Sequence, residues 1–243
     1  MATQVVDDSA LKELEEELTE LANAQFESDA YNHMFSVPFS LKGAQEFFKQ
    51  HAQFNLNRRD CWGYVQALAP LQIKQFVWDH ETEELDGVPD RGGLNHYELA
   101  VKQGEAWGLT PDDYYNAPTL DGTLTCCHAW ISLAQNSPWR TSFAASSALE
   151  YSNSDEIVRG GAISRRIGEK LERELGIPMK KQLSNEEHTV AEIEHAKMLM
   201  RAAKLFGETA QDREQILDGA KKTWAVDRIF RKFLGDLMEQ YAD

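Results

Sequence analysis

The chain has 243 residues, 42% of them hydrophobic and 10% aromatic, which is enough for one large or two small domains with a substantial core. Its 25 basic and 40 acidic residues give a formal net charge of −15, and no basic run is present that would neutralise nucleic-acid phosphates or bind an anionic membrane surface. We therefore expect neither a nucleic acid nor a membrane as a partner.

The cysteines and the first residues favour a reducing compartment. Cys61, Cys126 and Cys127 are odd in number and lack the C-x-x-C spacing of zinc and redox motifs. A disulfide framework is therefore not expected, and a cytoplasmic location is the default. The acidic stretch that starts at Asp7 does not resemble a signal peptide, and no apolar run reaches the length of a membrane span.

Hydrophobic periodicity predicts helices along the whole chain. Apolar residues recur at helical spacing, and no alternating strand pattern bounded by hairpin turns is present. The predicted helices cover residues 7–28, 41–69, 71–85, 94–107, 123–151 with a break near Pro138, 157–175, 184–205 and 211–241. Residues 32–38 are predicted as a connector and residues 86–93 as a breaker. We predict an all-α fold with a single domain over residues 1–243, a bundle of about seven or eight helices.

The penultimate predicted helix carries the main chemical motif. Ser184 and Glu187 have the S-x-x-E spacing of a capping box at its start. His188, Glu192 and His195 follow at offsets of four and three residues, so at about 100° per residue they leave the helix within an arc of roughly 60°. Such a trio also arises by chance in a helix rich in glutamate. Two imidazoles and a carboxylate suit iron, manganese or zinc, whereas the H-E-x-x-H motif of metalloproteases is absent.

Other carboxylates and histidines are candidates to meet this face. Metal sites in helical bundles need further carboxylates from neighbouring helices. Glu150 ends an apolar, small-residue segment, where a buried unpaired carboxylate would be costly; the alternative is an exposed helix end. His96 begins the helix after the breaker, and Glu84 closes the helix before it. Glu81 and Glu83 are alternatives for the carboxylate at this position.

Nucleophilic catalysis has less support in the sequence. There is no G-x-S-x-G motif and no glycine-rich phosphate loop. Cys126 and Cys127 precede His128, but side chains of consecutive helical residues point apart. Buried packing residues are therefore the favoured interpretation of the two cysteines.

Together these residues resemble a known family. The spacing His188-x3-Glu192-x2-His195 is similar to the H-x3-D-x2-H motif of the haem-oxygenase-like diiron oxidases, in the TenA/PqqC/CADD-like superfamily. The resemblance implies a haem-oxygenase-like helical bundle. It also implies six metal ligands in chain order: Glu84, His96, Glu150, His188, Glu192 and His195. Glu192 stands where the family usually has Asp, which would move the second metal or change how the carboxylate binds.

The resemblance also implies an activity. Two Fe(II)/Fe(III) ions with O2 as co-substrate would oxidise a C–H or N–H bond of a small organic molecule, often an amino acid or a fatty acid in this family. The metal-free PqqC branch lacks the histidine trio, so the presence of both His188 and His195 favours the metal-using branch. A homodimer is the family expectation. No catalytic residue beyond the metal ligands is predicted.

Three alternatives stay open from the sequence. A metal-free TenA-like hydrolase would use Cys126 or Cys127 as nucleophile, a PqqC-like oxidase would use the histidines as acid–base groups, and a third possibility is a non-catalytic ligand-binding protein. In the diiron oxidase that the resemblance implies, Arg58, Arg59 or His51 would be candidates to bind a substrate carboxylate.

Overall fold

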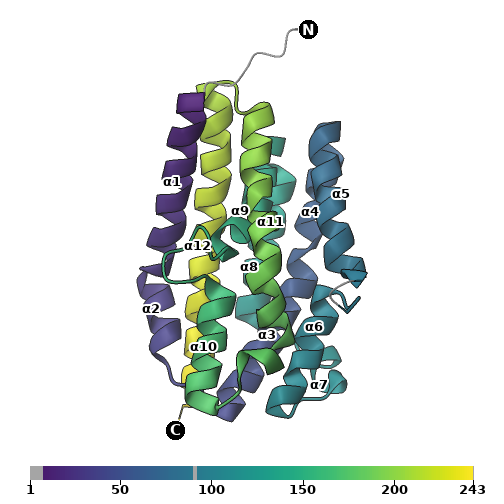
Figure 1. The fold of residues 1–243 in the computed structure, drawn as a ribbon, viewed down its shortest axis with the longest axis vertical. Helices are drawn as coiled ribbons and strands as arrows, with labels where there is room; N and C mark the ends of the chain where they lie inside the picture. Colours follow the sequence, from purple (N-terminus) through teal and green to yellow (C-terminus); the bar gives the residue numbers. More distant parts are fainter. Residues whose placement is uncertain (1–7, 90–91, 243) are drawn as a thin grey trace.

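The computed structural model describes residues 8–89 and 92–242, and these residues form helices and loops without a strand (Figure 1). The all-α prediction is confirmed. The α-helices are α1 (Asp8–Phe26), α2 (Asp29–Ser36), α3 (Leu41–Arg58), α4 (Asp60–Leu68), α5 (Leu71–Asp86), α6 (His96–Gln103), α7 (Pro111–Tyr115), α8 (Asp121–Asn136), α9 (Trp139–Asn153), α10 (Ile163–Leu175), α11 (Leu183–Phe206) and α12 (Ala210–Glu239). Short 3-10 turns cover Gly104–Trp107 and Met179–Lys181. Asp7 of the first predicted helix and residues 90–91 of the predicted breaker lie outside the described residues.

The described residues contain more helices than the seven or eight expected. One of them, the short helix α7, lies outside the predicted helical ranges. The predicted helix over 41–69 is divided at Arg59, and the break expected near Pro138 separates α8 from α9. The predicted connector over 32–38 is mostly helical, because α2 buries Tyr31 and Met34 against α12. Within the described residues, no helix has the length and apolar character needed to cross a membrane.

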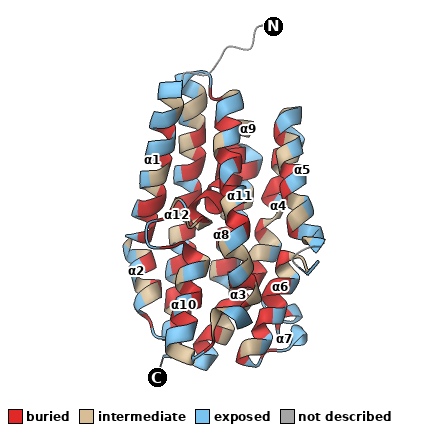
Figure 2. Cartoon of the chain, in the orientation of Figure 1, coloured by how far each residue is buried: buried red, intermediate tan, exposed pale blue. Residues whose placement is uncertain are grey.

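Helix α9 forms the centre of the bundle. Every residue from Thr141 to Ser152 is buried, and the helix packs against α12, α11, α8 and α4. The buried faces of the surrounding helices point toward this centre, and their exposed faces point outward (Figure 2). Its small side chains permit close packing, and the hydroxyls of Ser146 and Ser147 donate to carbonyls one turn earlier. Glu150 thus lies on a helix that has no solvent-exposed face along this stretch.

The predicted capping box at the start of α11 is wrong. The helix begins at Leu183, and Ser184 lies inside its first turn. The side-chain oxygen of Gln103, at the end of α6, accepts hydrogen bonds from the backbone N–H groups of Ser184 (3.0 Å) and Asn185 (3.2 Å). A distant glutamine therefore satisfies the free N–H groups that a local cap would otherwise bind.

Candidate metal centre

Glu150 on α9 is buried beside an arginine. Its Oε1 accepts a hydrogen bond of 2.8 Å from Nη2 of Arg58. Nη1 of the same arginine donates to the carbonyl of Ser146 at 3.1 Å. Burial alone would raise the pKa of Glu150, but the charges of Arg58 and His80 outweigh it and lower that pKa. The carboxylate predicted at the end of an apolar segment is thus buried and ionised.

Glu84 on α5 is the first carboxylate of the cluster. Its Oε1 lies 2.8 Å from Nδ1 of His96 and 3.6 Å from Nδ1 of His195, while Arg59 binds its Oε2 at 2.8 Å. Although burial opposes ionisation, His96 and Arg59 hold the pKa of Glu84 well below its usual range. Glu81 also binds Arg59, and Oε2 of Glu83 lies 3.5 Å from Nε2 of His195 although its side chain is 46% exposed. Glu84 is the buried acid, and it lies close to both His96 and His195.

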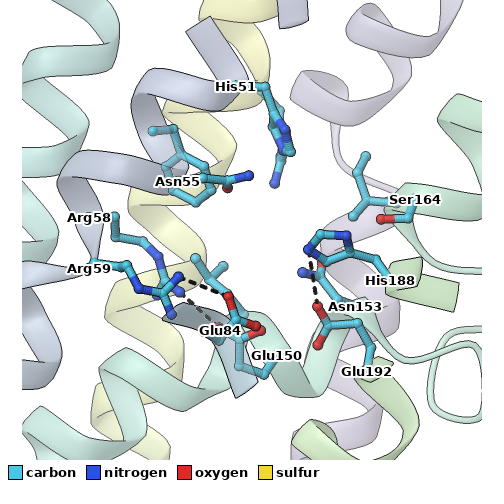
Figure 3. A pocket seen from close by; sticks show the side chains of 14 residues that line it. His51, Asn55, Arg58, Arg59, Glu84, Glu150, Asn153, Ser164, His188 and Glu192 are labelled. Carbon is cyan, nitrogen blue, oxygen red and sulfur yellow. Dashed lines mark hydrogen bonds and ion pairs between the residues drawn. The ribbon is translucent and has the colours of Figure 1, made fainter. Parts of the chain in front are cut away.

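The three candidates on α11 point to the same side, as their spacing predicts. Oε1 of Glu192 lies 4.0 Å from Nε2 of His188, and its Oε2 lies 3.8 Å from Nδ1 of His195. Figure 3 shows His188 and Glu192 pointing into a pocket toward Glu84 and Glu150. Burial, followed by the charges of Glu150 and Glu84, raises the pKa of Glu192 well above its usual range.

His96 completes the set from α6. Asn95 caps this helix by accepting from the backbone N–H of Glu98 at 2.8 Å, which fixes His96 as the first helical residue. The ring centroids of His96 and His188 are 4.6 Å apart. The structure therefore brings together all six predicted residues, which come from α5, α6, α9 and α11.

His80 also belongs to this cluster, although the sequence analysis did not select it. Its Nε2 lies 3.9 Å from Oε1 of Glu84 and 4.0 Å from Oε1 of Glu150, and its ring centroid is 4.6 Å from that of His195. One ligand atom from each of His80, Glu150 and His195 lies within 4.8 Å of the other two. The four-residue offset between His80 and Glu84 was the signal that could have found it, because it places both on one face of α5.

The donor atoms and their surroundings fit a metal such as iron. Nδ1 of His188 lies 2.6 Å from the carbonyl of Ser184, and Nδ1 of His80 lies 3.1 Å from Glu81, so Nε2 of each ring faces the cluster. Such outer contacts are usual for histidines that ligate metals. Among the described residues, five buried atoms of the cluster have no hydrogen-bond partner: Nε2 of His80, Nδ1 of His96, Nδ1 and Nε2 of His195, and Oε2 of Glu192. A cation would bind Oε2 of Glu192 and the lone pair of one nitrogen in each neutral imidazole.

The cysteines lack the surroundings of a nucleophile. Burial raises the pKa of the Cys126 thiol to about 11 and that of the Cys127 thiol to about 12, so both are protonated at neutral pH. Neither is among the residues that line the pocket over the cluster. This geometry gives no support to a thiol-dependent hydrolase.

Arg58 and Arg59, two candidates for binding a substrate carboxylate, have a different role in the structure. Arg58 binds Glu150, and Arg59 forms ion pairs with both Glu81 and Glu84. The two guanidinium groups therefore hold and neutralise carboxylates of the cluster itself.

The helices form a bundle whose interior contains a cluster of histidines and carboxylates. The family model described as "iron-containing redox enzyme" matches residues 45–228. The chain belongs to this family of iron-containing redox enzymes.

Solved structures confirm the haem-oxygenase-like fold. A CADD-like protein of unknown function from Nostoc punctiforme is 16% identical, with a TM-score of 0.72 over 97% of this chain and 98% of that one. A domain of unknown function with a heme oxygenase-like fold from Shewanella denitrificans is 12% identical, with a TM-score of 0.73 over 98% of this chain and 94% of that one. No functionally curated protein matches the chain.

Proposed function

We propose that this protein is an iron-dependent oxidase or oxygenase, which uses a non-haem diiron centre and O2 to oxidise a small organic substrate that is amino-acid-like or fatty-acid-like. The observation that carries the proposal is the convergence of three glutamates and three histidines in the interior of a chain from an iron-containing family. Those six are Glu84, His96, Glu150, His188, Glu192 and His195; His188 is half-buried, and the other five are buried.

These six residues would hold two iron ions, and His80 is an additional donor beside Glu150. When bound, the iron would supply the electrons that activate O2. Carboxylate oxygens favour the ferric state, which suits a centre that is oxidised by O2. Three negative carboxylates also offset the charge of two divalent cations better than imidazoles alone would.

The surrounding residues have roles of their own. Arg58 and Arg59 bind one oxygen each of Glu150 and Glu84, which fixes the orientation of these carboxylates. Burial of the cluster limits the access of bulk water, so a reactive oxidant would be protected from it.

Anaerobic titration with Fe(II) followed by metal analysis tests the proposal. We expect the full chain to retain about two irons after desalting, and His188→Ala and His195→Ala to retain less than half of that amount, because each removes one imidazole ligand of the proposed set. The matched control is His128→Ala, which removes an exposed histidine on α8 and should leave the iron content unchanged.

A second step separates an oxidase from an inert metal site. The iron-loaded protein is mixed with O2, and a transient visible absorption band is the expected result. Iron content no higher than that of a metal-free protein standard would refute the diiron centre. Retained iron that shows no spectral change with O2 would refute the oxidase.

A further inference from the structure

One arginine in the pocket over the cluster has unused hydrogen-bond donors. Arg231 on α12 is only 3% exposed and lines the pocket that also contains Glu84, Glu150 and Glu192. Its Nη2 lies 3.0 Å from Oδ1 of Asp227, but its Nε and Nη1 have no hydrogen-bond partner among the described residues. Leaving charged donors buried and unpaired is costly, so the pocket is built to receive an acceptor at this position.

Neighbouring contacts hold this arginine in place. Oδ2 of Asp227 accepts hydrogen bonds of 2.6 Å from both Gln25 and Tyr31, which fixes the carboxylate that binds Nη2. The guanidinium carbon also lies 5.8 Å from the ring centre of Tyr31 and 5.4 Å from that of Phe230. Arg231 is therefore an ordered donor, unlike a mobile surface arginine.

Asn55 on α3 is a second unsatisfied donor in the same pocket. Its Nδ2 is buried without a hydrogen-bond partner in the described part of the chain, and the residue lines the pocket together with Arg231. In Figure 3, Asn55 and His51 lie across the pocket from Glu192, with Glu84 and Glu150 below them. The donors thus come from α3 and α12, whereas the carboxylates of the metal centre come from α5, α9 and α11.

The pocket is small. Its volume is about 50 Å³, and one water molecule needs roughly 10–15 Å³ by the same measure. It therefore has room for a carboxylate with a short carbon skeleton, and a long fatty-acid chain does not fit inside it.

We infer that Arg231, assisted by Asn55, binds the carboxylate of a short organic acid, so that the rest of the molecule points toward the metal-binding residues. Calling this acid the substrate rests on the proposed function. Binding of the carboxylate itself does not, because its donors are separate from the metal ligands. Between the two substrate types named above, the inference selects the short, amino-acid-sized acid.

Acetate is the probe, and the full chain is used without added metal. We expect saturable binding of [1-13C]acetate by NMR titration, and no binding of the uncharged acetamide of the same shape. We expect Arg231→Gln combined with Asp227→Asn to lower the affinity for acetate at least about tenfold, because a hydrogen bond to a charged group is lost. The second substitution keeps Asp227 from being left buried without its positive partner. Asn55→Ala should weaken binding about threefold.

Arg228→Gln is the matched control, because this arginine lies on the same helix but does not line the pocket. Circular dichroism and thermal melting confirm that each variant is folded, and Asn55→Ala tests the site without altering the arginine. Equal binding of acetate and acetamide, or unchanged acetate binding by the double variant, would overturn the inference. Acetate binding in a chain that retains no iron would support the carboxylate site and refute the diiron centre. Iron retention without acetate binding would support the diiron centre and refute the carboxylate site.

Discussion

The three buried glutamates of the centre have different electrostatic surroundings. Glu84 and Glu150 are each bound by an arginine, and their pKa values are lowered. Glu192 is only 1% exposed, and the described residues pair it with no arginine or lysine; His188 at 4.0 Å and His195 at 3.8 Å are its basic neighbours, and its pKa is raised. Glu192 therefore depends on a cation for the stability of its charged form, in contrast to the other two.

We expect Glu192→Gln to weaken iron binding at least about tenfold while the fold is retained. The amide has the same shape as the carboxyl but carries no charge, so it removes an anionic ligand without adding strain. Anaerobic Fe(II) titration measures the affinity, and thermal melting without metal measures the stability. Glu194→Gln is the control on the same helix, because Glu194 is 74% exposed and pairs with Lys197. Equal iron affinity of the two variants would contradict this role of Glu192.

The sequence predicted part of the centre at the level of residues. Helical spacing alone placed His188, Glu192 and His195 on one face, and the structure agrees. The choice among three nearby acids could not be made from the sequence, because it depends on where α6 and α11 place His96 and His195 against Glu84. Arg231 could not be selected either, since its unused donors are visible only when its neighbours are in place.

Close contact between α9 and α12 places Glu150 in the centre of the bundle. The two helices meet where Gly219 of α12 faces Thr141 and Ala144 of α9. A Cβ atom added at Gly219 would lie 2.4 Å from the carbonyl oxygen of Thr141 and 2.9 Å from the Cβ of Ala144. The contact therefore requires a residue without a side chain.

We expect Gly219→Ala to destabilise the protein by about 1–3 kcal/mol, because the added methyl group forces the helices apart. Gly63→Ala is the matched control, since Gly63 is also helical but a Cβ there would meet nothing within 4 Å. There the gain in helix propensity should stabilise the fold by up to about 1 kcal/mol. Chemical denaturation measures both, and the prediction fails if the two substitutions shift stability in the same direction.

The elements were predicted well where the signal is local and poorly where it is not. The break before α9 follows from Pro138, which disfavours a helical conformation at Ser137. The start of α11 depends instead on Gln103, about 80 residues earlier in the chain, so the local S-x-x-E spacing was misleading. Likewise α2 is helical because it packs against α12, a contact that its short sequence does not reveal.

At the scale of the whole molecule, the centre connects four helices that contribute candidate ligands, α5, α6, α9 and α11. A cation that binds only the folded chain stabilises the whole fold by mass action, by about 2.7 kcal/mol at a concentration one hundred times Kd. Helical periodicity and the resemblance were enough to predict an all-α, haem-oxygenase-like bundle, but not how its helices close around the cluster.

We therefore expect anaerobic Fe(II) to raise the melting temperature by roughly 5–10 °C under those conditions, given the size of the chain. Mg²⁺ is the control ion, because it prefers oxygen ligands and water to imidazoles. His195→Ala should abolish most of the shift, while His128→Ala should keep it. An equal shift with Mg²⁺ would mean that the stabilisation does not come from the histidine–carboxylate centre.

The seven cluster side chains are spread from His80 to His195, with the buried helix α9 between the two ends of this range. As the ribosome makes the chain, the first carboxylate emerges long before the α11 trio exists. No partial product that ends before residue 195 contains the full ligand set. In the proposed enzyme, the complete iron site therefore exists only after residue 195 has been made and α11 has packed against α9.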